Sequence, residues 1–213
     1  WQSVVDWIRS HHGWQVERVW MRYIPGIVKG IGMVVNVFTQ PGDKIIIQPP
    51  VYHPFRLVPE HNDREIVMNP LRWVGDTYEM DFEQLESLID KDCKMLILSN
   101  PHNPGGVVWE KEALVKLAQI CSAHGILVIS DEIHAEMTYP QFRHHPFATV
   151  SEEAAACSVT FMAPSKTFNI AGIVSSYALV PDSRIREKFY SFLEAGELNA
   201  GTIFAFTATK AAY

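Results

Sequence analysis

Short apolar runs alternate with helix-like segments along most of this chain, and this alternation restricts the fold more than any other feature. The runs do not alternate polar with apolar residues, so we expect strands that are buried on both faces. Such strands separated by helices are typical of a mostly parallel sheet with helices on both faces. The predicted strands are 43–50, 64–71, 93–100, 126–132, 157–165 and 173–180. The predicted helices are 25–38, 52–61, 81–90, 110–125 and 182–197.

The two ends of the chain also have helical patterns. Val4, Val5 and Ile8 fall at helical spacing near the start, and residues 201–213 form another helix-like run. We see no internal repeat, low-complexity tract or linker, so we predict one α/β domain over residues 1–213. Because each end lies inside a helix-like pattern, we also expect this sequence to be a piece of a longer chain.

Composition narrows the class of protein. The chain has 213 residues, of which 47% are hydrophobic and 20% charged, as in ordinary globular proteins. Its net charge of -6 argues against a nucleic-acid-binding face. Cys93, Cys121 and Cys157 are far apart and odd in number, which indicates free thiols in a reducing compartment. With no signal peptide and no membrane-length apolar run, we expect a soluble cytoplasmic protein.

Three polar residues follow three of the predicted strands. Asn103 follows the run "MLILSN", Asp131 follows "ILVIS", and Lys166 follows "SVTFMAPS". Each alone has an ordinary explanation: a turn amide, a cap or a solvated lysine. However, ligands of open α/β sheets bind outside the carboxyl ends of the strands, where these three side chains would meet. Their coincidence at one edge favours a binding site.

An amine, a carboxylate and an amide at one edge suit pyridoxal phosphate. A lysine condenses with an aldehyde to a Schiff base, and an aspartate partners the pyridine nitrogen of this cofactor. Tyr52 follows another predicted strand, and its ring could stack on a flat cofactor or simply pack in a turn. The helix that begins near Pro25 and Gly26 could bind phosphate through its free N–H groups.

The motifs "NPHNPGG", "SDEIH" and "SKTFNIAG", in this order, resemble those of fold-type-I pyridoxal-phosphate enzymes of the aspartate aminotransferase superfamily. With "PGIVKGI" and "PPVYHPF" included, the chain most resembles the MalY/PatB branch, the cystathionine β-lyase-like C–S lyases. The resemblance covers nearly the whole chain. It implies the following roles: Lys166 forms the Schiff base, Asp131 partners the pyridine nitrogen, Asn103 donates to the ring oxygen, Tyr52 stacks on the ring, and the backbone at Ile27 and Val28 holds phosphate.

The chain departs from the superfamily pattern at several positions. His134 stands where many members have tyrosine; its imidazole could bind the ring oxygen or only pack. Val174 replaces a frequent phosphate-binding arginine, and Ala163 replaces a frequent hydroxyl, for which Ser165 is the candidate substitute. The other histidines, among them His11, His12, His144 and His145, show no metal-ligand spacing and are interpreted as solvated or structural.

The resemblance implies an enzyme that cleaves cystathionine or cysteine S-conjugates to a thiol, pyruvate and ammonia. An aminotransferase is the first alternative, and a non-catalytic cofactor-binding or regulatory relative is the second. A nicotinamide-binding domain is disfavoured, because no G-x-G-x-x-G follows a strand. The family is homodimeric and has a C-terminal small domain with a substrate-binding arginine. We therefore expect residues 1–213 to be part of the large cofactor domain, without that small domain.

Overall fold

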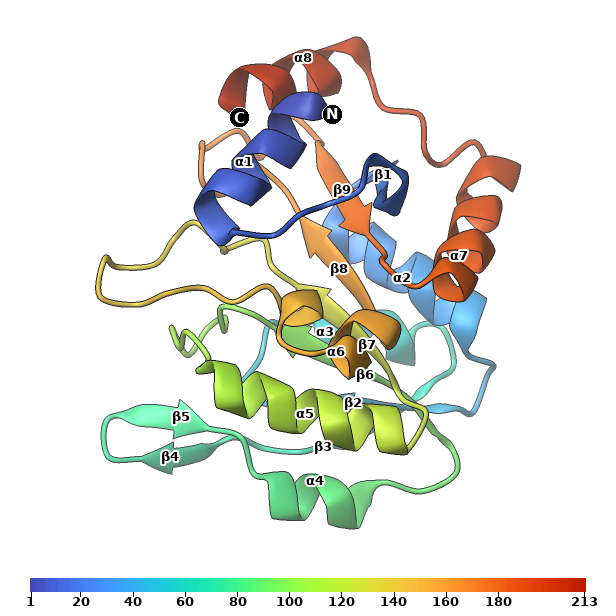
Figure 1. Ribbon diagram of the computed structural model, residues 1–213. Helices are drawn as coiled ribbons and strands as arrows, with labels where there is room; N and C mark the ends of the chain where they lie inside the picture. Colours follow the sequence, from blue (N-terminus) through green and yellow to red (C-terminus); the bar gives the residue numbers. More distant parts are fainter.

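A seven-stranded sheet forms the centre of the protein in the computed structural model, which describes residues 1–213 (Figure 1). Its strands in spatial order are β1 (Met21–Ile24), β9 (Ser176–Leu179), β8 (Ser158–Met162), β7 (Leu127–Asp131), β6 (Cys93–Ser99), β2 (Lys44–Ile47) and β3 (Glu65–Met68). The five strands from β8 to β3 are parallel, whereas β9 and β1 are each antiparallel to their neighbours. The prediction of a mostly parallel sheet is confirmed.

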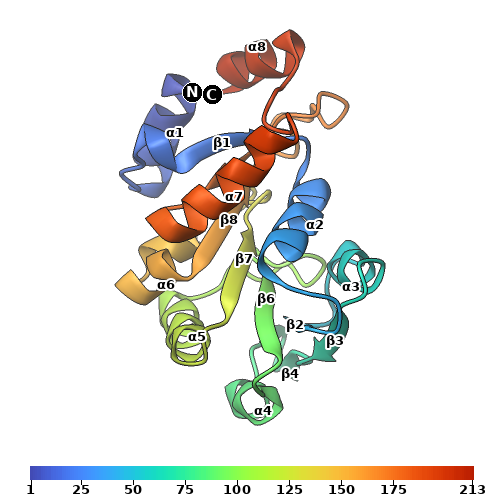
Figure 2. The ribbon, with the colours of Figure 1, turned by 90° about the vertical axis from the view of Figure 1, so that its right-hand side faces the viewer.

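Helices cover both faces of this sheet. They are α1 (Gln2–His12), α2 (Ile27–Phe38), α3 (Pro54–Glu60), α4 (Phe82–Leu88), α5 (Lys111–Ala123), α6 (Glu152–Ala156), α7 (Ser183–Ala195) and α8 (Ile203–Ala212). Figure 2 shows α5 and α6 on one side of the strands and α2 and α3 on the other. None of the helices has both the length and the apolar character needed to cross a membrane.

Alternate residues of each central strand enter two different hydrophobic cores. In β6, Met95 and Ile97 pack with α2, α3 and α7, whereas Leu96 and Leu98 pack with α4, α5 and α6. These four side chains are 0–1% exposed. Burial on both faces explains why the strands have continuous apolar runs.

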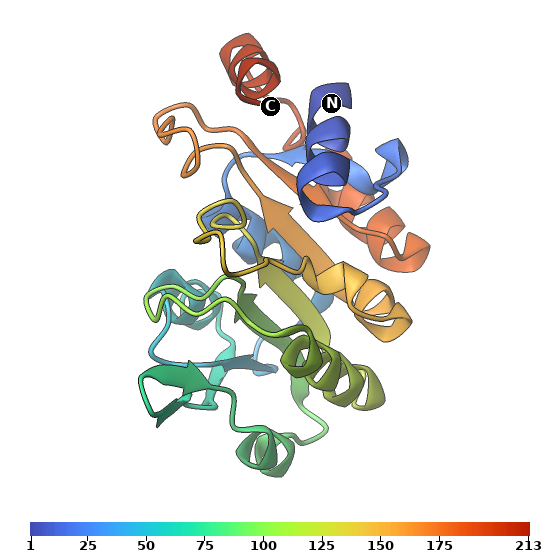
Figure 3. The same cartoon turned by 60° about the vertical axis from the view of Figure 1, so that its left-hand side comes forward.

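A third core joins the two ends of the chain to the antiparallel edge of the sheet. Val4 and Ile8 of α1 pack in this core with Met21 of β1 and Tyr177 of β9. The ring of Trp7 lies 5.4 Å from that of Tyr213, and Figure 3 shows α1 beside α8. The helical patterns at both ends therefore belong to one packed corner of the protein.

Local sequence signals account for several helix boundaries. Asp81 caps α4 by accepting a hydrogen bond from the N–H of Gln84 at 3.0 Å. Gly125, which was predicted to end α5, has a φ of +66°, a conformation that glycine adopts without strain. Pro54 lies in the first turn of α3, where its missing N–H has no helical acceptor.

Three features were not predicted from the sequence: β1, the short helix α6, and a two-stranded hairpin of β4 (Arg72–Val74) and β5 (Thr77–Glu79). Each is three to five residues long, too short for a clear periodicity. The hairpin is also mostly exposed, so no apolar pattern marks it. The predicted strand 157–165 ends earlier than expected, at Met162, because a turn begins at Pro164.

Candidate active site

A pocket of about 290 Å³ lies at the carboxyl ends of the parallel strands. All the site residues predicted from the sequence line it, namely Ile27, Val28, Tyr52, Asn103, Asp131, His134, Ser165 and Lys166. They come from connections that are far apart in the sequence. The sheet topology brings these connections to one edge, as expected for an open α/β fold.

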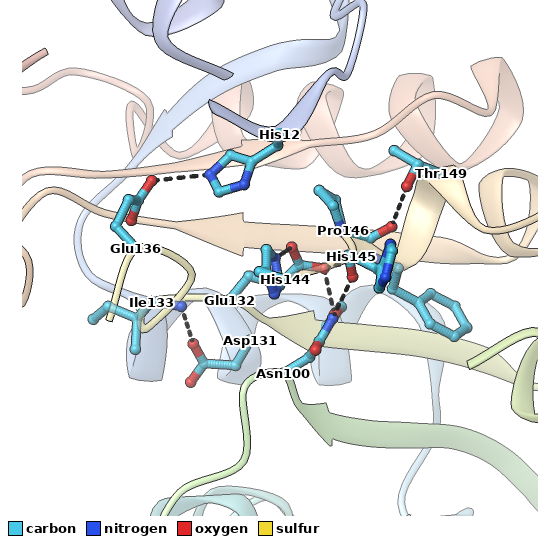
Figure 4. Close-up of polar contacts among 12 residues, drawn as sticks. His12, Asn100, Asp131, Glu132, Ile133, Glu136, His144, His145, Pro146 and Thr149 are labelled. Carbon is cyan, nitrogen blue, oxygen red and sulfur yellow. Dashed lines mark hydrogen bonds and ion pairs between the residues drawn. The ribbon is translucent and has the colours of Figure 1, made fainter. Parts of the chain in front are cut away.

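Asp131 is the last residue of β7, where it pairs in register with Ser99 of β6 and Phe161 of β8. Its side chain is held from one side only. Oδ1 accepts a hydrogen bond from the backbone N–H of Ile133 at 3.1 Å, and Oδ2 has no partner in the protein (Figure 4). The residue is 7% exposed. Because Asp131 lines the pocket, its carboxylate oxygen without a donor is available to a ligand.

Burial raises the pKa of Asp131 from 3.8 to about 7, and the neighbouring charge of Glu132 also raises it. The N–H of Ile133 and the positive charge of Lys166 act in the opposite direction. A ligand that brings a positive charge or an N–H donor to Oδ2 would lower this pKa.

Lys166 lies in the turn that follows β8, and its side chain is exposed in the pocket. The turn is closed by hydrogen bonds from the N–H of Phe168 to the carbonyl of Pro164 at 2.9 Å and from the N–H of Ile170 to the carbonyl of Ser165 at 3.0 Å. The amine itself forms no hydrogen bond or salt bridge with the protein. It therefore avoids the cost of an unpaired buried ammonium by reaching solvent.

Asn103 and Tyr52 belong to two loops that are joined to each other. The N–H of Tyr52 donates to the carbonyl of Asn103 at 3.1 Å, and the N–H of Asn103 donates to Oγ of Ser99 at 2.9 Å. These backbone bonds fix both residues, while the Asn103 amide and the Tyr52 hydroxyl have no protein partner. Tyr52 is 36% exposed and lines the pocket, so part of its side chain is accessible to a ligand.

The first turn of α2 supplies a site for an anion. Gly26 caps the helix with a φ of +110°, a conformation that side chains disfavour, and no side chain accepts from the N–H groups that follow. The N–H groups at Ile27, Val28 and Lys29 therefore lack acceptors within the helix. Val174 lies against Gly26, so no arginine side chain is available at that position.

His134 is half-buried and lines the same pocket. Burial lowers the pKa of its imidazole, and the positive charge of Lys166 lowers it further. The ring forms no hydrogen bond with the protein. A neutral imidazole at this place can donate to or accept from a ligand.

Some pocket residues were not named from the sequence, namely Lys29, Ser99, Ala171, Ile173, Ser175 and Ser176. Ser99 ends β6, so the strand-end signal that found Asp131 could have found it. Ser176 begins the antiparallel strand β9, so a signal based on the carboxyl ends of strands does not include it. Lys29 had no such signal, because a lysine in a first helical turn is usually solvated.

The histidines interpreted as structural lie outside this pocket. His144 is buried and bonds to Glu132 at 2.8 Å, and His12 bonds to Glu136 at 3.1 Å (Figure 4). The ring of His11 stacks on Trp7 with 3.6 Å between centroids. The cysteines are free, as predicted, although Cys157 is only partly buried.

The family model described as aminotransferase class I and II matches residues 2–206. The chain belongs to this family. The resemblance to the MalY/PatB branch is confirmed by two curated relatives. Cystathionine beta-lyase PatB of Bacillus subtilis (strain 168) is 44% identical over 212 residues, which are 99% of this chain and 55% of that protein. Protein MalY of Escherichia coli (strain K12) is 29% identical over 99% of this chain and 54% of its own length.

A solved structure of the family is also similar. Cystalysin from Treponema denticola, which contains a pyridoxal 5'-phosphate cofactor, superposes with a TM-score of 0.94 at 35% identity. The match covers 98% of this chain and 53% of cystalysin. The chain thus spans about half the length of the relatives that it matches.

Proposed function

We propose that residues 1–213 are part of the large domain of a pyridoxal-phosphate-dependent C–S β-lyase. The observation that carries this proposal is the pair of unpartnered groups in one pocket, the Oδ2 atom of Asp131 and the amine of Lys166. The substrate would be cystathionine or a cysteine S-conjugate, which together with water would give a thiol, pyruvate and ammonia. This choice of reaction is supported by the similarity to PatB of Bacillus subtilis, which is named as a cystathionine beta-lyase.

The pocket fits the cofactor group by group. The free oxygen of Asp131 suits a pyridine N–H, and the Asn103 amide suits the ring oxygen. The amine of Lys166 suits an aldehyde, and the first turn of α2 suits a phosphate. Ser165 and Lys29 also line the pocket, and they could supply the hydroxyl and the positive charge that Ala163 and Val174 do not provide.

When bound, pyridoxal phosphate supplies a ring that accepts electrons from the substrate carbon. The residues of the chain then have separate tasks. Asp131 keeps a negative charge opposite the ring nitrogen, and Asn103 and His134 place hydrogen-bonding groups at the ring oxygen. Tyr52 covers one face of the ring. Lys166 takes the proton from Cα of the substrate as general base, after which the bond from Cβ to sulfur breaks and the thiolate leaves.

The complete protein is proposed to be a homodimer acting on a small sulfur amino acid, with substrate-carboxylate contacts contributed from outside these 213 residues. An aminotransferase would use the same residues for the first proton transfer. It would differ in the later steps. Lys166 would have to return the proton to the cofactor, and an added keto acid would have to accept the amino group.

The test is to assay the full-length protein with cystathionine and no keto acid. We expect pyruvate and ammonia in equal amounts over many turnovers, and none from the Lys166→Ala variant. If pyruvate forms only when a keto acid is added, the enzyme is an aminotransferase. If the cofactor binds but neither reaction occurs, with these or other amino acids, the protein is a non-catalytic relative.

A further inference from the structure

The carboxylate of Glu136 lies outside the pocket and is bound by three donors. Its Oε1 atom accepts from Nε1 of Trp7 at 3.0 Å and from Nε2 of His12 at 3.1 Å. Its Oε2 atom accepts from Oγ1 of Thr167 at 3.1 Å. The Glu136 side chain is 9% exposed, and Figure 4 shows its contact with His12.

The donors come from two segments that are distant in the sequence, and one of them adjoins the proposed catalytic amine. Trp7 and His12 belong to α1, whereas Thr167 directly follows Lys166. Glu136 itself lies in the loop that begins after Asp131. One side chain therefore connects the loop after β7 to the turn after β8.

The charge of Glu136 is maintained by these donors. Burial alone would raise the pKa of its carboxyl group, but the hydrogen bonds from His12, Trp7 and Thr167 outweigh burial and the pKa lies below its ordinary value. An ionised acceptor forms stronger hydrogen bonds than a neutral one, so the contact with Thr167 is a charge-assisted bond.

Apart from the Phe168 ring, which packs against the rings of Trp7 and Tyr213 with 5.6 Å between centroids in each pair, the Lys166 segment has few other restraints. The lysine side chain has no partner in the protein, and the turn around it is held internally by the two backbone bonds described above. The bond from Thr167 to Glu136 is the one side-chain hydrogen bond that ties residues 164–170 to the rest of the protein. It is formed by the residue that directly follows Lys166, so it restrains the backbone beside the lysine.

We propose that Glu136 is a positioning residue for Lys166, which acts through Thr167 to fix the amine relative to Asp131 and the bound cofactor. This inference rests on the proposed role of Lys166 as the cofactor lysine, but it does not depend on whether the enzyme is a lyase or an aminotransferase. A purely structural role for Glu136 would be limited to docking α1 through Trp7 and His12.

The two roles are separated by variants on either side of the carboxylate, made in the full-length protein with its cofactor bound. Thr167→Val removes the hydroxyl near Lys166, and Thr167→Ser retains it. Trp7→Phe is the matched control, because it removes a donor to the same carboxylate on the α1 side and keeps an aromatic ring against Phe168. Glu136→Gln removes the negative charge and so weakens the hydrogen bonds both to Thr167 and to the donors of α1.

The first readout is the visible absorption spectrum of the bound cofactor and its pH titration, and the second is kcat. We expect Thr167→Val and Glu136→Gln to shift the titration and to lower kcat by roughly tenfold to a hundredfold, as for a displaced reacting group. Thr167→Ser should restore both properties. Trp7→Phe should lower the melting temperature while leaving the spectrum and kcat unchanged.

Two outcomes would overturn the proposal: a normal spectrum and kcat in Thr167→Val, or equal changes in Trp7→Phe and Thr167→Val. If Glu136→Gln does not fold, the comparison of Thr167→Val with Thr167→Ser still tests the proposal. Failure of the proposed function is recognised separately, because the cofactor spectrum responds to Lys166 even if cystathionine is not a substrate.

Discussion

Asp131 is placed where a ligand can bind it, and this placement lowers the stability of the folded protein at neutral and higher pH. Its carboxylate is buried with one oxygen unpaired, and burial raises its pKa to about 7. Because the folded-state pKa is above the ordinary value of 3.8, the folded protein binds this proton more tightly than the unfolded chain. The associated stability is fully present below pH 3.8 and is lost as the pH rises through about 7.

We therefore predict that Asp131→Asn stabilises the cofactor-free protein at pH 8 but not at pH 4. Asparagine keeps the acceptor for the N–H of Ile133 and removes the buried charge, whose cost is at most about 4 kcal/mol at 1.36 kcal/mol per pKa unit. Thermal denaturation at the two pH values measures the difference, with the exposed Asp76→Asn as control. A lower melting temperature of Asp131→Asn at pH 8 would contradict the argument.

The same variant should lose activity with the cofactor bound, because an amide does not supply the negative charge opposite the ring nitrogen. A change that stabilises the empty protein and inactivates the loaded one is characteristic of a functional residue.

At the scale of the element, the position of α2 depends on a close approach to the sheet. A Cβ atom on Gly30 would lie 2.7 Å from Cδ1 of Ile24 in β1 and 3.1 Å from Cζ of Phe161 in β8. Both neighbours are fully buried in the core, so moving either side chain requires the surrounding core to repack. The absence of a side chain at Gly30 thus sets the distance at which the proposed phosphate-binding turn of α2 lies from the strand ends.

We predict that Gly30→Ala destabilises the protein by about 1–3 kcal/mol through overpacking, which exceeds its gain in helix propensity. Gly32→Ala in the same helix is the matched control, because its Cβ atom would meet only Cγ1 of Val58 at 3.4 Å. That variant should be neutral or more stable by up to about 1 kcal/mol. Denaturant unfolding compares the two; equal stabilities would show that the contact at Gly30 relaxes without cost.

The sequence predicts the central elements well because burial on both faces leaves continuous apolar runs. It does not predict the direction of β9, since apolar runs are the same in parallel and antiparallel strands. The hairpin of β4 and β5 had a signal in the two-residue turn Gly75-Asp76, but its exposed strands gave no apolar pattern around that turn.

The site could be predicted to a similar extent. Asp131, Asn103 and Lys166 were found because strand ends converge at one edge, a rule that needs no side-chain detail. Ser175 and Glu136 could not be found in this way. Ser175 is bonded to Thr209 of α8, and Glu136 is bonded to α1, so their surroundings depend on how the ends of the chain pack.

At the scale of the whole molecule, the chain spans about half the length of its relatives, so we predict that these 213 residues alone do not release pyruvate from cystathionine. The contacts with the substrate carboxylate, which we propose lie outside these residues, would be absent, and Cα would be poorly placed for proton removal by Lys166. The measurement compares pyruvate release by the isolated chain and by the full-length protein, both with the cofactor. Binding of the cofactor, followed by its absorbance, is the control that the isolated chain is folded. Steady turnover by the isolated chain would contradict the prediction.

The antiparallel pairing of β8 and β9 has a consequence for motion. Residues 163–175 join two neighbouring strands directly, whereas the connections from β2 and β6 lead into α3 and α5, which cover the faces of the sheet. The proposed cofactor lysine is therefore carried by a segment that can open locally without moving a covering helix. Opening of this segment and global unfolding of the sheet are distinct events with separate free energies.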